Sequence, residues 1–261
     1  MTALEAVILG LVEGFTEYLP VSSTGHLLVV EHLLGMEGTA ATSYAIVIQA
    51  GAILAVLGAY GDRWRTILTG GAAGRQLFVR LMVAFVPAGM IGFLFDDVVE
   101  SMLGGLWPVV VAWAIGAVAI LVLDGRHGDD QVDTMSNRQA LVIGLAQCLA
   151  LWPGTSRSLA TILAGQLTGL GKAASVEFSF LLGFVTLGAA TTWSGVKHGD
   201  ELLAAYGLQP ILIGLVVSWA SASLAVRGLV AWLDGHGLRI FAVWRLLIAL
   251  AVTIGLLTTE C

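Results

Sequence analysis

A short stretch near the start of the chain gathers polar groups that could act on an anion. From Leu11 to His26 the sequence reads LVEGFTEYLPVSSTGH, which contains two carboxylates, four serine or threonine hydroxyls and one imidazole. If the residues up to Tyr18 are helical, Glu13 and Glu17 lie one turn apart on one face, where like charges repel. Pro20 ends the helix, so Glu17 lies at the negative end of the helix dipole. A bound cation, or protonation of one carboxyl group, would relieve this repulsion.

A second polar stretch, Pro153-Gly-Thr-Ser-Arg-Ser158, has a related pattern. In both stretches a proline precedes several hydroxyl residues inside an apolar region, which predicts a break followed by a new half-helix. The first N–H groups of a helix have no partner within the helix, so each start is a ready anion site. We expect one start to be formed by Ser22, Ser23, Thr24 and Gly25, and the other by Gly154, Thr155, Ser156 and Arg157.

Arg157 is the most informative single residue of the second stretch. An arginine at membrane depth is costly and usually faces a polar partner, and its planar fork matches a phosphate or a carboxylate. Together with His26 and the two carboxylates, it predicts phosphate binding or phosphoryl chemistry.

Purely structural roles remain open for the same residues. The hydroxyl groups can act as helix N-caps, Glu13 or Glu17 can pair with Arg157 or Arg245, and His26 can be a packing residue. We expect Glu31 and His32 at the membrane interface. Glu177 either belongs to the site or pairs with Lys172.

The composition indicates an integral membrane protein. The 261 residues are 57% hydrophobic and 11% charged, and the mean hydropathy is +0.91, well outside the range of soluble domains. Six segments approach the roughly 20 apolar residues that a bilayer core requires. These segments are about Ser43–Tyr60, Gln76–Phe95, Trp107–Leu123, Ala173–Trp193, Gly207–Val226 and Ile240–Thr258.

Two further apolar regions, Leu4–Leu34 and Gln139–Leu170, are too long for one span and too interrupted for two. Irregular backbone at membrane depth is tolerated only where it is buried in protein or lines a polar cavity. The predicted fold is therefore an all-α membrane protein, one domain over 1–261, with six transmembrane helices and two re-entrant helix-loop-helix hairpins.

The two hairpins also resemble each other, because Ala6-Val-Ile-Leu-Gly10-Leu is similar to Ala140-Leu-Val-Ile-Gly144-Leu. This predicts two repeats, at about 1–123 and 138–258. Loops rich in arginine alternate with loops that hold at most Lys197, so we expect the arginine-bearing loops to be cytoplasmic and the N-terminus to be outside. The repeats are then inverted, and their tips meet near the midplane, as in many transporters. The loops that we expect to be cytoplasmic contain Arg63, Arg65, Arg75, Arg126, Arg138, Arg227 and Arg239.

The first two motifs, Glu13-Gly-Phe-Thr-Glu17-Tyr-Leu-Pro-Val-Ser-Ser-Thr-Gly-His26 and Pro153-Gly-Thr-Ser-Arg-Ser158, together with Glu177-Phe-Ser-Phe-Leu-Leu182, closely resemble the undecaprenyl-diphosphate phosphatase family of the bacitracin-resistance type. The resemblance covers nearly the whole chain. One departure is Gly183-Phe-Val-Thr186, where an alanine and a proline are expected.

The resemblance implies hydrolysis of undecaprenyl diphosphate to undecaprenyl phosphate and inorganic phosphate. This reaction recycles the lipid carrier for cell-wall synthesis at the outer side of the bacterial inner membrane. The family's acidic motif falls on Glu13 and Glu17, its serine and histidine on Ser23 and His26, and its arginine on Arg157.

We hypothesise that Ser23 is the nucleophile, with His26 or Glu17 as its general base. Arg157 and the backbone N–H groups of both tips would hold the terminal phosphate. Glu13 and Glu17 would bind a divalent cation, Mg²⁺ or Ca²⁺. Attack by His26 or by an activated water is the alternative.

The rival function is a polyprenyl-phosphate flippase or organic-anion transporter, since such proteins share the inverted plan. Pure translocation needs no nucleophile next to a base, which favours the phosphatase. The expected partners are the polyprenyl lipid, entering through a lateral opening, the membrane lipids, and a second copy of the chain as a homodimer. No nucleic acid is expected.

Overall fold

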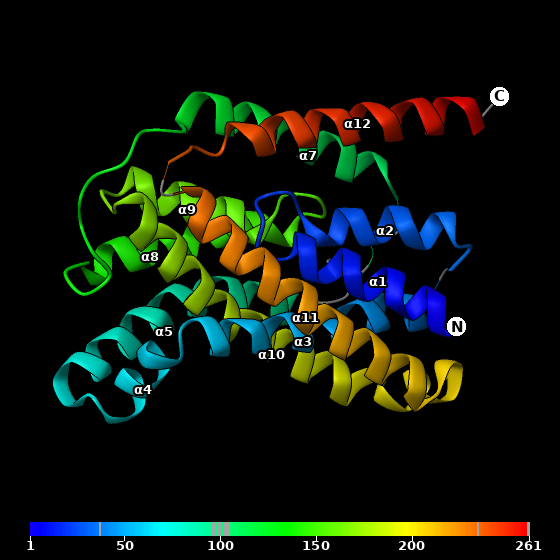
Figure 1. The fold of residues 1–261 in the computed structure, drawn as a ribbon, viewed down its shortest axis with the longest axis horizontal. Coiled ribbons are helices and arrows are strands. Elements are labelled where there is room, and N and C mark those ends of the chain that lie inside the picture. Colours follow the sequence, from blue (N-terminus) through cyan, green and yellow to red (C-terminus); the bar gives the residue numbers. More distant parts are fainter. Residues whose placement is uncertain (37, 96–97, 99–100, 102–104, 234, 260–261) are drawn as a thin grey trace.

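The computed structural model describes residues 1–36, 38–95, 98, 101, 105–233 and 235–259, and within these residues it is all-helical, without a named strand. Figure 1 shows the helices lying roughly along one long axis, with α7 and α12 side by side on one flank. The helices are α1 Ala3–Thr16, α2 Ser23–Leu33, α3 Thr39–Ala59, α4 Gly61–Thr69, α5 Gly71–Leu94, α7 Trp107–Leu123, α8 Asn137–Gln147, η1 Cys148–Leu151, α9 Arg157–Leu167, α10 Lys172–Tyr206, α11 Leu208–Leu233 and α12 Arg239–Thr259.

The described residues contain five helices that are long and apolar enough to cross a membrane, α3, α5, α10, α11 and α12. This confirms an all-α, multi-pass plan. The sixth predicted span, Trp107–Leu123, forms α7 with the predicted bounds, but its 17 residues make it a shorter apolar helix. Helix α10 runs well past the predicted end at Trp193, to Tyr206, because its polar last third still favours helix.

Both interrupted regions fold as broken hairpins. Helices α1 and α2 occupy one end of the molecule, whereas α8 and α9 occupy the other, so the two hairpins point toward each other (Figure 1). Each first arm starts with a capping box, Thr2 with Glu5 in α1 and Ser136 with Gln139 in α8. Each arm stops shortly before the proline that its sequence predicted as a break, since proline cannot continue a helix.

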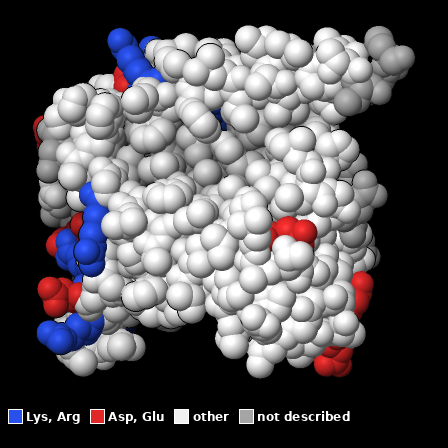
Figure 2. All heavy atoms as spheres, turned by 45° about the vertical axis from the view of Figure 1, so that its right-hand side comes forward, with Lys and Arg blue, Asp and Glu red and all other residues white. Residues whose placement is uncertain are grey.

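The charged residues lie mainly toward the ends of the long axis. On the face shown in Figure 2, Lys and Arg gather at one end, and much of the surface between the ends is uncharged. At the arginine-rich end Arg63 contacts Glu177, with Nε to Oε1 at 2.6 Å, and also Asp133. Glu177 therefore neither joins the site nor pairs with Lys172, and both of its predicted roles are wrong. The N-terminus lies at the opposite end (Figure 1).

Candidate functional site

The two hairpin tips share one unusual backbone conformation. Ser22 and Ser156 are the N-caps of α2 and α9, with φ of 75° and 74°. A positive φ costs free energy in a residue other than glycine and persists only where its surroundings impose it. The Ser22 hydroxyl accepts from the Gly25 N–H, and the Ser156 hydroxyl accepts from the Leu159 N–H. Both half-helices therefore start in the same way, as the sequence similarity predicts.

One direct hydrogen bond joins the two tips, and another attaches the first tip to α7. The Ser158 hydroxyl, in the first turn of α9, donates to the Leu19 carbonyl of the first tip at 3.0 Å. The Trp113 indole of α7 donates to the Val21 carbonyl at 2.9 Å. The helix starts of α2 and α9 thus lie next to each other inside the protein, although they come from hairpins at opposite ends.

Glu17, Ser23 and Arg157 meet between the tips. The Ser23 hydroxyl donates to Oε2 of Glu17, and Nη2 of Arg157 donates to Oε1 of the same carboxylate at 3.0 Å. All three side chains are buried, with Arg157 only 9% exposed. A carboxylate that accepts from a serine hydroxyl is placed to take its proton.

The Arg157 guanidinium is fixed on other sides as well. Nη1 donates to the Ser179 carbonyl of α10 at 2.9 Å, and the group lies over the Tyr18 ring, 5.3 Å from its centroid. A Cβ built on Gly183 would overlap the guanidinium. The Arg157 guanidinium therefore packs directly against the backbone at Gly183, which the sequence alone did not indicate.

Glu13 lies one turn below Glu17 and is fully buried. Within the described residues neither of its carboxylate oxygens has a hydrogen-bond partner. The charges of Glu13 and Glu17 repel, and Arg157 offsets part of this repulsion. No group of three or more His, Cys, Asp or Glu side chains suited to a metal ion occurs in the described part of the chain. A cation held by the acidic pair would therefore need ligands from a substrate or water, which is how Mg²⁺ usually binds in phosphate sites.

A cavity of about 200 Å³ opens onto these groups. Its wall contains most of the predicted site residues, namely Glu17, Ser22, Ser23, Thr24, Gly154, Ser156 and Arg157. The polar part faces the tips, whereas Ala88, Leu151 and Leu187 form an apolar side. Trp152, which also lines the cavity, is 46% exposed at the surface of the protein.

Four predicted residues do not line this cavity: Glu13, Gly25, His26 and Thr155. His26 has both ring nitrogens occupied, since Nδ1 contacts the Ser22 carbonyl at 2.7 Å and Nε2 accepts from the Trp244 indole at 2.9 Å. Its ring also stacks on Trp244. Among the described contacts of His26 there is none to Ser23, so of the two proposed bases only Glu17 touches the Ser23 hydroxyl.

Sequence reasoning did not place two polar residues that line the cavity beside Gln49, namely Gln147 and Thr186. The Thr186 hydroxyl donates to Oε1 of Gln147 at 3.1 Å, while Nε2 of Gln147 has no partner within the described residues. A usable signal was present for Gln147, because it occupies the position in the second hairpin that Glu13 occupies in the first, counting from Gly144 and Gly10.

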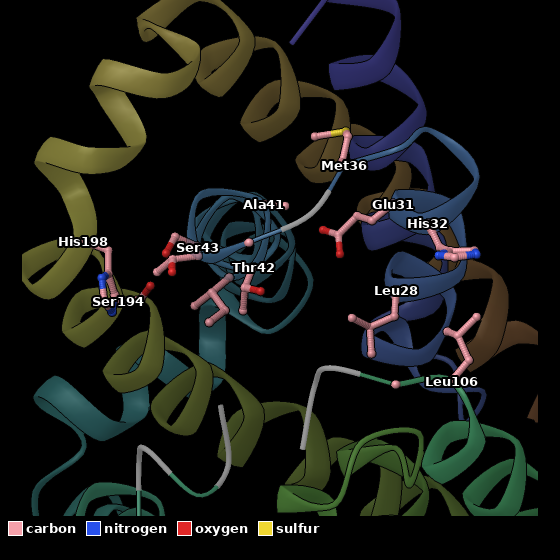
Figure 3. A pocket seen from close by; sticks show the side chains of 14 residues that line it. Leu28, Glu31, His32, Met36, Ala41, Thr42, Ser43, Leu106, Ser194 and His198 are labelled. Carbon is pink, nitrogen blue, oxygen red and sulfur yellow. The ribbon is translucent and has the colours of Figure 1, made fainter. Parts of the chain in front are cut away.

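A larger cavity of about 550 Å³ lies between the end of α2, the start of α3 and α10 (Figure 3). Glu31 lines it and is only 4% exposed, whereas His32 is exposed, and the interfacial position of both residues stays a prediction. The described lining contains no Lys or Arg, which makes it a poor phosphate site. Its residues Leu28, Ile46 and Ser194 lie about one helical turn from Thr24, Gln49 and Ala190 of the smaller cavity. The two cavities therefore follow the same helix faces.

Comparison with known proteins identifies relatives over nearly the full length. Residues 6–251 match the family model described as bacitracin resistance protein BacA. A protein of Sorangium cellulosum (strain So ce56) named undecaprenyl-diphosphatase is 42% identical over 253 residues, which cover 93% of this chain and 82% of the relative. A protein of Ectopseudomonas mendocina (strain ymp) with the same name is 41% identical over 256 residues, covering 96% of this chain and 92% of the relative.

Proposed function

The chain belongs to the bacitracin resistance protein BacA family, and we propose that it hydrolyses undecaprenyl diphosphate to undecaprenyl phosphate and inorganic phosphate in the cavity between its hairpin tips. The observation that carries this assignment of the site is the convergence of Glu17, Ser23 and Arg157 on one buried cavity. It joins a base, a hydroxyl nucleophile and a planar cation, the parts that phosphoryl transfer requires.

In the proposed first step Ser23 attacks the terminal phosphorus and gives its proton to Glu17. The bond between that phosphorus and the bridging oxygen breaks, and undecaprenyl phosphate leaves with the bonding electron pair. Glu17 passes this proton to the departing undecaprenyl phosphate. It then takes a proton from a water molecule, whose oxygen attacks the phosphorus of the phosphoserine. The bond from phosphorus to Oγ of Ser23 breaks, Glu17 returns its proton to that oxygen, and inorganic phosphate is released. The hydrogen bond from Ser23 to Glu17 supports Glu17 as the base in place of His26.

Arg157 would bind the equatorial oxygens of the transferred phosphoryl group. Its Nε is buried and has no partner among the described residues, so a donor remains available for a phosphate oxygen. The N–H groups in the first turns of α2 and α9 would add donors from both tips. The tips thus surround the anion with fixed dipoles that need little rearrangement during the reaction.

Glu13 and Glu17 would hold a divalent cation, Mg²⁺ or Ca²⁺, together with phosphate oxygens. The unpartnered oxygens of Glu13 support this, because a fully buried carboxylate without a partner is costly. The cation would neutralise charge on the diphosphate.

The apolar side of the cavity suits the lipid end of the substrate. Trp152 and Ala190 line the cavity and are also exposed, so the cavity reaches the apolar surface between η1 and α10. We place the lateral opening there, because removing the isoprenoid chain from the bilayer would cost roughly 0.8 kcal/mol per CH₂ group. Inorganic phosphate, which is polar, would leave through the larger cavity on the same helix faces.

For the membrane arrangement we propose six transmembrane helices, with α7 as the short sixth, and two re-entrant hairpins in inverted repeats. The arginine-rich end would face the cytoplasm of a bacterial inner membrane, and the active site would be reached from the exterior. Cysteine accessibility tests this orientation. A cysteine introduced between α4 and α5 should react with a thiol reagent that cannot cross the membrane only after the cytoplasmic face of the membrane has been exposed.

A phosphate-release assay on the purified full-length chain tests the function. Polyprenyl diphosphate in detergent with Mg²⁺ or Ca²⁺ should release inorganic phosphate with wild type and not with Arg157→Ala. Transport of polyprenyl phosphate across vesicles without phosphate release would instead support the flippase alternative and overturn the assignment.

A further inference from the structure

A second buried arginine, Arg245 of α12, lies behind the two tips and outside the cavity. Its side chain is completely buried, with 0% exposure. The guanidinium donates only to backbone carbonyls, and these come from three parts of the chain. They are Ala112 at 2.9 Å and Trp113 at 3.2 Å in α7, Pro20 at 3.2 Å in the first tip, and Gly154 at 3.0 Å and Thr155 at 3.3 Å in the second tip.

These contacts differ from the ion pairs that the sequence suggested for Arg245. Among the described residues no carboxylate contacts it, whereas Arg157 pairs with Glu17. Carbonyl dipoles stabilise a buried guanidinium but do not neutralise its charge. An arginine deep in a membrane protein is costly and is usually retained for a reason other than stability. The net positive charge therefore lies directly behind the loops that would hold an anion.

The position of Arg245 also fixes the geometry of the site. Pro20 and Thr155 come two or three residues before Ser23 and Arg157, the two residues that would attack and hold the phosphate. One rigid guanidinium bonded to both loops sets the spacing between them, because its donors form a planar fork. Gly116 of α7 makes room for this group, since a Cβ there would overlap the guanidinium.

We propose that Arg245 is a positioning residue for the phosphate site. It holds the Ser23 tip and the Arg157 tip at the separation that the reaction needs, and its uncompensated charge favours binding of the anionic diphosphate. This inference rests on the proposed function of the same site. A purely structural role would predict that any folded variant keeps its turnover and its affinity.

Substituting Arg245 by lysine or by methionine separates its effect on the spacing of the two tips from the effect of its charge. Arg245→Lys keeps the charge but cannot reach all five carbonyls, so kcat should fall at least about tenfold while KM changes less than about threefold, in line with the sensitivity of catalysis to small displacements. Arg245→Met removes the charge as well, so KM should also rise. Both are measured per amount of folded protein, with Arg239→Lys as the matched control, because Arg239 is an exposed arginine in the first turn of the same helix.

A substitution of Gly116 tests the inference even if the two Arg245 variants do not fold. Gly116→Ala keeps Arg245 and its charge but displaces the guanidinium, so kcat should fall with KM near that of wild type. Wild-type values of kcat and KM in folded Arg245→Lys and Gly116→Ala would overturn the inference and leave the proposed function intact. Absence of phosphate release by wild type itself would overturn the proposed function instead.

Discussion

The two hairpin tips have nearly the same backbone and different chemistry. Each carries a serine N-cap with positive φ, at Ser22 and Ser156, and each is followed by a half-helix of 11 residues. The residues that follow these caps differ. Ser23 is the first residue of α2, and Arg157 is the first residue of α9. The shared backbone gives two helix starts with free N–H groups that would bind an anion in the proposed mechanism, and their side chains would have different roles.

The first arms of the two hairpins also differ in chemistry at corresponding positions. Glu13 of the first hairpin corresponds to Gln147 of the second, so the acid of one repeat is an amide in the other. Both side chains are buried, and each has at least one atom without a partner in the described structure. In the proposed mechanism the first hairpin would supply the base and the nucleophile and the second would supply the Arg157 guanidinium, so neither hairpin would have a complete site alone.

The largest expected effect comes from removing the hydroxyl that is specific to the first tip. Ser23→Ala should lower kcat by about 10³-fold or more if Ser23 is the nucleophile, since nothing else in the step replaces it. Ser156→Ala, which removes a hydroxyl from the second tip, is the matched comparison and should retain far more activity. Phosphate release under saturating lipid measures both. Activity of Ser23→Ala within a few-fold of wild type would favour direct attack by water or by His26.

The next effect comes from the cation that is specific to the second tip. Arg157→Lys keeps the charge but loses the fork, so kcat should fall about 10²-fold, as when an oxyanion donor is removed. Steady-state kinetics would measure the loss, with the exposed Arg239→Lys as the control. Near-normal turnover would show that charge alone is sufficient at this position.

Much of this arrangement was predictable from local patterns. The apolar runs set the approximate spans, and the proline followed by hydroxyl residues located both tips, because these signals depend on neighbouring residues only. The contacts of Arg245 with five carbonyls were not predictable, since they join α12 to three distant segments. The role of Gly183 was missed for the same reason, since it depends on Arg157. Gln147 was missed although its correspondence with Glu13, counting from Gly144 and Gly10, was visible in the sequence.

An intermediate effect is expected from replacing Glu13 of the first hairpin by glutamine, the residue type at the corresponding position of the second hairpin. Glu13→Gln should raise the Mg²⁺ or Ca²⁺ concentration for half-maximal activity by about 10-fold to 100-fold, as for other losses at metal sites. Activity titrated with each cation measures this shift. Glu31→Gln is the control, because Glu31 is also a buried glutamate but lines the larger cavity. An unchanged cation requirement would remove Glu13 as a ligand.

A smaller effect is expected at Gly183, which lies directly against the Arg157 guanidinium. Gly183→Val should displace the guanidinium and lower kcat several-fold, because the flexible side chain has to shift away from the added Cβ and its two methyl groups. The matched change is Gly188→Val on the same helix, where a Cβ meets nothing within 4 Å. Equal rates for the two variants would mean that the guanidinium tolerates displacement.

The smallest expected effect concerns the backbone that the two tips share. Ser156→Gly loses the cap hydroxyl but relieves the positive φ, so the free energy of unfolding should change by only a few tenths of a kcal/mol. Ser156→Ala loses the cap and keeps the strain, so it should be less stable by about 1 kcal/mol. Thermal unfolding of the purified protein measures both, and the same pair at Ser22 should give the same order. A different order at the two tips would mean that they do not store the same strain, and that the likeness of their backbones does not extend to their energetics.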